Sequence, residues 1–151
     1  MPQALYLEDL VVGTRWSGGE FLMTAEEALT FAARYDPQPM HLDAAAAAEG
    51  YYGELIASGW NTAALAMRET SRARLFGETP LLGLGVDKIQ WPKPVRHGDR
   101  LIVEWEVVGN LPSKSKPDFG VVKVQTTVLN QSREVVLMMT SNCWVLRKPA
   151  T

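Results

Sequence analysis

The feature that most constrains the fold is a change of hydrophobic periodicity near Pro80. Before it, apolar residues recur at the three- and four-residue spacing of a helix face in "TAEEALTFAARY" and "ASGWNTAALAMRETSRARLF". After it they alternate, as in "DRLIVEWEVV", where Leu101, Val103 and Trp105 share one face. This order predicts an α+β domain in which a long helix covers the apolar face of an antiparallel sheet.

Local signals set the ends of the predicted helices. Thr24 followed by Glu27 indicates a capping box at the start of the first helix, and Pro37 ends that helix. Asp43 and Gly50 predict the N-cap and the end of the alanine-rich helix between them. The long helix is expected to start near Ser58 and to end before Gly77. Its expected buried face comprises Trp60, Ala63, Ala64, Met67 and Leu75.

Five segments have the composition and alternation of strands, and one lies before the helices. They are "TRWSGGEFLM", "LGVDKIQW", "DRLIVEWEVV", "FGVVKVQTTVLN" and "REVVLMMTSNCWVL". The last two are expected to form a hairpin around residues 130–133. Residues 1–151 are therefore interpreted as one domain.

Composition excludes several functional classes. The 151 residues carry a net charge of −2 and no basic block, which argues against nucleic acid as the main partner. The single cysteine, Cys143, excludes an internal disulfide and a cysteine metal cluster. The N-terminus has no signal-peptide pattern, and no apolar run reaches the ~18 residues of a membrane helix. We expect a cytoplasmic protein without membrane association.

Asp36 and His41 lie in a proline-rich stretch, "DPQPMHLD", predicted to be a rigid loop. Rigid placement is what an acid–base pair requires, although aspartate and proline are also ordinary turn residues. Downstream, Ser58 is a natural N-cap, and Gly59 begins the long helix, where an unpaired backbone N–H can stabilise an oxyanion.

The stretch "QWPKPVRHGDRL" is interpreted as a strand that breaks at its prolines and continues into a turn. Lys93 and Arg96 are candidates for contacts with ligand phosphates. His97 is interpreted as an exposed turn residue.

Together these segments resemble the MaoC-like dehydratases, which include the (R)-specific enoyl-CoA hydratases. The family signature is Asp, any residue, Asn or Gln, Pro, an apolar residue, His, any residue, Asp, and residues 36–43 match it. "IASG" and "WPKPVRHGD" continue the resemblance over most of the chain. It departs at Gln38 and Ser58, where better-known hydratases have asparagine and often histidine, and the segment that covers the acyl chain is not evident.

The resemblance implies the hotdog fold, an antiparallel sheet wrapped around a central helix at residues 60–76. It also implies a homodimer or larger homo-oligomer with its active site at the subunit interface. The implied reaction is reversible syn hydration of a trans-2-enoyl thioester to an (R)-3-hydroxyacyl thioester, with no metal or cofactor beyond the CoA or phosphopantetheine of the substrate.

The resemblance also implies roles for individual residues. Asp36 is expected to be the main base, gripping a water between itself and His41, while the Gly59 N–H binds the thioester oxygen. The expected substrate-binding residues are Gln38, Ser58, Trp60, Met67, Lys93 and Arg96. Met67 either shapes an acyl tunnel or packs in the core. Two alternatives remain, a hotdog acyl-CoA thioesterase and a non-catalytic acyl-thioester binding subunit.

Overall fold

The computed structural model describes residues 3–150, which form one five-stranded antiparallel sheet and several helices. The elements, in chain order, are the 3-10 helix η1 (Leu7–Asp9), β1 (Arg15–Leu22), α1 (Ala25–Tyr35), α2 (Pro39–Leu42), α3 (Ala44–Glu49), α4 (Gly59–Ala73), β2 (Leu82–Gln90), β3 (Arg100–Pro112), β4 (Phe119–Leu129) and β5 (Val135–Leu146). The three longer helices, the five strands and the hairpin were predicted. The short helices η1 and α2 were not.

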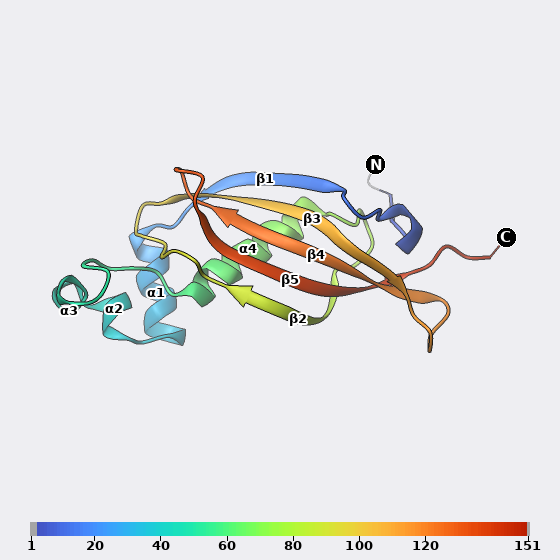
Figure 1. Ribbon diagram of the computed structural model, residues 1–151. Helices are drawn as coiled ribbons and strands as arrows, with labels where there is room; N and C mark the ends of the chain where they lie inside the picture. Colours follow the sequence, from blue (N-terminus) through green and yellow to red (C-terminus); the bar gives the residue numbers. More distant parts are fainter. Residues whose placement is uncertain (1–2, 151) are drawn as a thin grey trace.

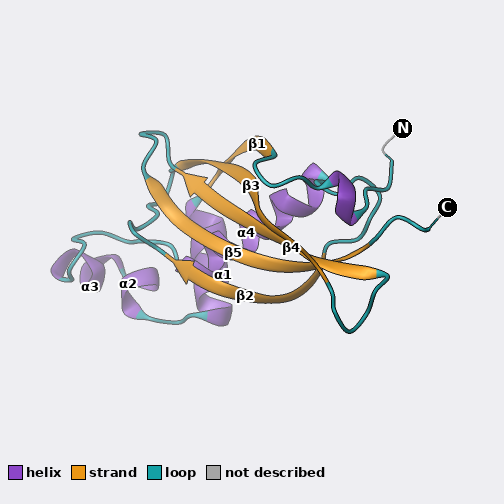
Figure 2. Cartoon of the chain, turned by 45° about the vertical axis from the view of Figure 1, so that its right-hand side comes forward, coloured by secondary structure: helices purple, strands orange, loops and turns teal. Residues whose placement is uncertain are grey.

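The strands follow the order β1-β3-β4-β5-β2, and every neighbouring pair is antiparallel. Helix α4 runs along one face of the curved sheet, and α1 to α3 gather beyond one end of it (Figure 1). A view turned by 45° shows the sheet as a continuous layer with α4 behind it (Figure 2). The sheet and α4 therefore make the two-layer arrangement predicted from the periodicity.

The core lies between α4 and the inward face of the sheet. Leu101, Val103 and Trp105 of β3 are almost fully buried there, as the alternation predicted. The Trp105 indole N–H donates to the Thr70 hydroxyl of α4 across 2.9 Å, so the largest core side chain also satisfies its polar atom. Burying each large apolar side chain contributes roughly 1.5–3 kcal/mol.

The buried face predicted for the long helix is wrong at three of its five residues, while Leu75 is buried and Ala63 is partly buried against the core. Trp60 and Met67 are 58% and 45% exposed, and Ala64 is also exposed. The buried face instead comprises Asn61, Thr62, Leu65, Ala66 and Thr70. Alanines give little contrast between helix faces, and three of the buried side chains are polar, so the apolar pattern selected the wrong side. The helix also ends at Ala73 rather than Phe76, because Arg74 adopts a left-handed conformation with φ of 50°.

The caps of the shorter helices agree with the sequence. The Thr24 hydroxyl accepts from the Glu27 N–H at 3.1 Å, although within residues 3–150 Glu27 makes no return bond to Thr24. The Asp43 carboxylate accepts from the N–H groups of Ala45 and Ala46, and Gly50 ends α3. These caps set where the chain enters α1 and α3, and α3 begins directly after the stretch that carries Asp36 and His41.

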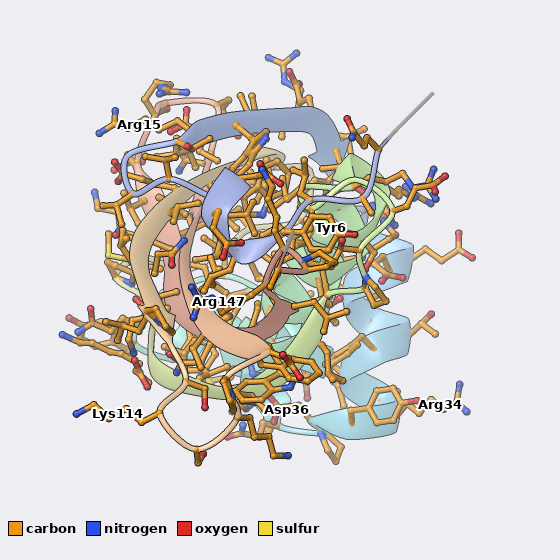
Figure 3. All side chains as sticks on the ribbon, turned by 90° about the vertical axis from the view of Figure 1, so that its right-hand side faces the viewer. Tyr6, Arg15, Arg34, Asp36, Lys114 and Arg147 are labelled. Atoms are coloured by element: carbon orange, nitrogen blue, oxygen red, sulfur yellow. The ribbon has the colours of Figure 1, made fainter. Side chains whose placement is uncertain are left out.

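Charged side chains surround the core, and Arg15, Arg34 and Lys114 project away from the body of the protein (Figure 3). Among the described residues, none of the helices has the length and apolar character required to cross a membrane.

Candidate active site

Asp36 is held where α1 ends. Its backbone N–H donates to the Ala32 carbonyl at 2.9 Å, and Pro37 prevents the helix from continuing. The stretch after it, predicted to be a rigid loop, contains a short helix. Residues 39–42 form α2, because Pro39 occupies the first helical turn, where a missing N–H costs nothing. This short helix places the His41 side chain on the buried side.

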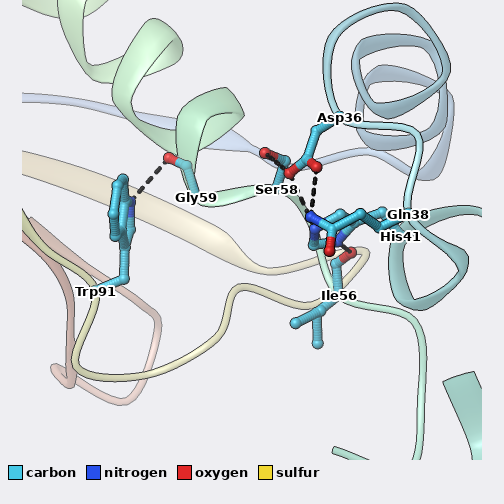
Figure 4. A network of polar contacts seen from close by, with 7 residues as sticks. All are labelled: Asp36, Gln38, His41, Ile56, Ser58, Gly59 and Trp91. Carbon is cyan, nitrogen blue, oxygen red and sulfur yellow. Dashed lines mark hydrogen bonds and ion pairs between the residues drawn. The ribbon is translucent and has the colours of Figure 1, made fainter. Parts of the chain in front are cut away.

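The two predicted catalytic side chains are in direct contact. His41 Nε2 lies 3.1 Å from Asp36 Oδ2, and the His41 residue is only 3% exposed (Figure 4). The predicted position of a water between the two side chains is therefore wrong, since they contact each other directly.

The contact made by the second ring nitrogen of His41, Nδ1, shows that this nitrogen carries a hydrogen. Nδ1 lies 2.9 Å from the Ile56 carbonyl oxygen. A carbonyl only accepts, so Nδ1 carries a hydrogen and donates it. Nε2 is then the ring nitrogen that faces the carboxylate, 3.1 Å from Oδ2. The pair can thus accept a proton at one moment and return it at another.

Two further donors surround the Asp36 carboxylate. The Gln38 amide donates to Oδ1 at 2.6 Å, and the Ser58 hydroxyl donates to Oδ2 at 2.7 Å (Figure 4). Burial raises the pKa of Asp36, but these hydrogen bonds and the nearby His41 outweigh it and leave the pKa below its ordinary value. The carboxylate is therefore ionised at neutral pH.

Ser58 does not act as predicted. It occupies the N-cap position of α4, but its hydroxyl makes no capping bond to the helix and binds Asp36 instead. It is fully buried. Because Ser58 directly precedes Gly59, this hydrogen bond connects the Asp36 carboxylate to the start of the central helix.

Gly59 begins α4 beside the pair. Its N–H donates to no group within residues 3–150, as expected for the first turn of a helix. The preceding segment is held by the Ala57 N–H, which donates to the Val95 carbonyl at 2.8 Å, and by a β-bridge between Ile56 and Arg96. The unpaired amide therefore sits on a fixed backbone at the positive end of the helix dipole.

A cavity of about 220 Å³ adjoins the pair. His41 and Gly59 line it together with Trp60, Trp91 and Lys93, while Asp36 reaches it only through its contact with His41. Met67 lies outside this cavity. It lines a second one of about 540 Å³ on the side of α4 next to β2, which also contains Thr70 and Met139.

The two side chains predicted to contact ligand phosphates are paired with acidic residues. Lys93 forms an ion pair with Glu134, and Arg96 forms one with Glu54. Only Lys93 borders the cavity near His41. His97 is partly buried rather than exposed, and its Nε2 is buried without a hydrogen-bond partner among the described residues.

Sequence reasoning missed two residues of the site. The Ile56 carbonyl fixes the orientation of the His41 ring, and a backbone carbonyl leaves no signal in a sequence. The Trp91 indole N–H donates to the Gly59 carbonyl at 2.9 Å. The sequence feature that could have pointed to Trp91 is an aromatic residue directly before "PKP", at the end of a strand.

Comparison with known proteins agrees with this geometry. Residues 18–130 match the family model described as a MaoC like domain. A MaoC-like dehydratase from Rhodospirillum rubrum is 42% identical with a TM-score of 0.86, covering 97% of this chain and 100% of that one. The (R)-hydratase PhaJ1 from Pseudomonas aeruginosa is 29% identical with a TM-score of 0.73, covering 97% and 88%.

A curated relative adds sequence support. The uncharacterized protein YdeM of Bacillus subtilis strain 168 is 26% identical over 125 residues, covering 83% of this chain and 87% of that protein. The solved relatives have the hotdog fold, which the sheet and α4 reproduce here. The chain belongs to the family of proteins with a MaoC-like domain.

Proposed function

We propose that the protein catalyses reversible syn hydration of trans-2-enoyl thioesters to (R)-3-hydroxyacyl thioesters. The observation that carries the proposal is the 3.1 Å contact between His41 Nε2 and Asp36 Oδ2 beside the unpaired amide of Gly59. This reaction requires a pair of groups that accepts and returns a proton, and a hydrogen-bond donor that stabilises the oxyanion. The likeness to PhaJ1, an (R)-hydratase, supports the same reaction class.

The carboxylate retains room for a water. An ionised carboxylate accepts about four hydrogen bonds, and Asp36 receives three, from Gln38, Ser58 and His41. The remaining acceptor position can orient a water next to the pair. Attack forms the bond from water oxygen to C3 as the C2–C3 double bond breaks. The water proton passes to the pair, and the pair delivers a proton to the same face of C2.

Charge builds on the thioester oxygen during attack. The Gly59 N–H is the donor that we assign to that oxygen, since it borders the same cavity as His41 and has no partner of its own in residues 3–150. Collapse of the enolate-like intermediate at C2 returns the pair to its starting state, so no net proton is gained or lost.

We assign the acyl chain to the cavity along α4 that contains Met67. Eight residues separate Gly59 from Met67, about 12 Å along a helix at 1.5 Å per residue. Met67→Trp is therefore expected to slow hydration of long-chain enoyl-CoA by about 10–200-fold while crotonyl-CoA is little affected. Rates measured across chain lengths test this, and equal slowing of all chain lengths would contradict the assignment.

We assign the CoA phosphates to Lys93 and Arg96. The Lys93 and Arg96 side chains are 55% and 47% exposed, and Lys93 borders the cavity. Each would exchange a carboxylate partner for a phosphate. A substrate carried by phosphopantetheine on a protein would use the same thioester chemistry, so the pair and the Gly59 amide do not discriminate between the two carriers.

We propose a homodimer formed through β2. This edge strand is exposed along nearly its whole length, including Leu82, Leu84 and Val86, which are 57%, 57% and 51% exposed. An unpaired apolar edge is a template for a second strand, and exposed Met67 lies beside it across a shared cavity.

Val86→Asp is accordingly expected to shift the protein toward monomer, because it places two like charges at the joined edges, and to lower hydration with it. Sedimentation and activity are measured together, with Val11→Asp as the matched control, since Val11 is 61% exposed and Val86 51%. A wild-type monomer with full activity would reject the dimeric site.

Ser58→Ala removes one of the hydrogen bonds that lower the pKa of Asp36. Loss of a donor to the ionised form makes protonation of the pair easier, so the acid limb of kcat/KM is expected to move to higher pH. At neutral pH the loss should stay near ~10-fold, the size of one charged hydrogen bond. A pH profile that does not move would show that Ser58 does not tune the carboxylate.

The reaction class is tested by two assays run in parallel. One follows loss of enoyl absorbance over a panel of enoyl-CoA chain lengths, and the other follows release of free thiol. Hydration removes the enoyl signal without releasing thiol. Thiol release would favour the hotdog thioesterase, and binding without either signal would favour a non-catalytic subunit.

A further inference from the structure

Trp91 contacts Gly59 in two ways. Its indole N–H donates to the Gly59 carbonyl at 2.9 Å (Figure 4). Its ring also packs against the glycine, such that a Cβ on Gly59 would lie 2.6 Å from Trp91 Cε2 and Nε1. Side-chain carbons do not approach ring atoms this closely, so Trp91 is one physical reason why residue 59 must be glycine.

Glycine is the most flexible residue available for this position, and the amide of Gly59 has to keep one direction. The chain before it is fixed by the Ala57 bond to Val95 and by the Ser58 hydroxyl on Asp36. The chain after it is fixed by Trp91, which restrains the carbonyl of the same residue. Without the indole, one side of Gly59 would be restrained only by the first turn of α4.

Trp91 is 38% exposed, and its place in the chain and its contact with Trp60 restrain it. It directly follows the last residue of β2, Gln90, and precedes Pro92. The Trp60 ring packs edge-on against it, with centroids 5.1 Å apart and planes at 74°. Both rings line the cavity that contains His41 and Gly59. The indole therefore connects the end of β2 to Gly59, the first residue of α4.

We infer that Trp91 is a positioning residue for the Gly59 amide, fixing the oxyanion donor through the Gly59 carbonyl and the close ring contact. This inference rests on the proposed function, in which that amide binds the thioester oxygen. Trp91 does not touch the reacting atoms in this role. Its substitution should weaken stabilisation of the developing charge, while a residue that only forms the cavity wall would alter substrate binding alone.

Trp91→Phe separates the two roles, because it keeps an aromatic wall and removes the indole N–H. We expect kcat for crotonyl-CoA hydration to fall about 10-fold with KM within about twofold, a part of the 10²–10³ that a whole oxyanion donor is worth. Trp144→Phe is the matched control. Trp144 stacks on Phe119 at 4.9 Å and lies outside both cavities described here, so its variant should keep wild-type constants.

A second readout does not depend on turnover. A saturated acyl-CoA analogue with CH₂ in place of the thioester sulfur, ¹³C-labelled at the ketone, has neither a thioester to hydrolyse nor a C2–C3 double bond to hydrate. Its bound carbonyl stretch should lie at lower frequency than in water for the wild type, and should return toward the free value in Trp91→Phe. Trp91→Leu carries the same expectation if the phenylalanine variant does not fold.

Unchanged kcat together with an unchanged carbonyl frequency in a folded Trp91 variant would overturn the inference, as would a change confined to KM. A wild-type protein that fails to hydrate any enoyl-CoA, yet shifts the carbonyl frequency through Trp91, would reject the proposed reaction and retain the positioning role.

Discussion

Asp36→Asn and His41→Ala are each expected to lower kcat/KM for crotonyl-CoA hydration by at least ~100-fold, with the fold retained. Asparagine keeps the size of Asp36 but cannot take a proton from water. It also replaces one carboxylate oxygen by an NH₂ group, which donates where the oxygen accepted, next to Ser58 and His41. Alanine at position 41 removes the ring that bridges Asp36 and the Ile56 carbonyl.

Matched controls use the same chemical changes elsewhere. His97→Ala removes the other histidine, which lines neither cavity described here. Asp118→Asn neutralises an exposed aspartate at the far loop between β3 and β4. Both controls are expected to hydrate at wild-type rates. Near-normal rates in the two site variants would reject the catalytic assignment, provided that circular dichroism shows all four proteins folded.

Gly59→Ala is expected to lower kcat/KM by about 10²–10³. The added methyl group would lie 2.6 Å from Trp91, so either the indole or the first turn of α4 must shift and carry the amide with it. The change should not destabilise the protein through helix propensity, because alanine is the better helix former.

Gly19→Ala is the control for this variant. A Cβ at Gly19 meets nothing within 4 Å, so the same substitution there tests only the loss of backbone freedom. Gly59→Ala protein that binds the inert ketone analogue normally but hydrates slowly would support the oxyanion role. Hydration within about threefold of wild type would contradict it.

The fold was largely predictable because the sheet depends on alternation, a local pattern. Leu101, Val103 and Trp105 alternate with polar residues, and the structure buries them as expected. The face of α4 was not predictable in the same way. Alanines surround the helix, and Thr70 is buried because Trp105, 35 residues away, supplies a hydrogen bond that the local sequence does not reveal.

The candidate site was likewise predictable only where short local motifs carry it. Asp36, His41 and Gly59 were identified from short motifs. In the structure His41 and Gly59 line one cavity, and Asp36 contacts His41 directly. The supporting contacts depend on residues distant in sequence. Ser58 was assigned to helix capping, yet its hydroxyl binds a carboxylate 22 residues earlier, and Trp91 reaches Gly59 across 32 residues.

The central claim is that Asp36 and His41 act as one unit on an enoyl thioester, and the double variant Asp36→Asn/His41→Ala tests it most directly. Groups that work as a unit are not additive, so the double variant should hydrate crotonyl-CoA about as slowly as the slower single variant. If the separate losses instead multiply, or if the double variant retains wild-type hydration, the two side chains do not form the catalytic pair described here.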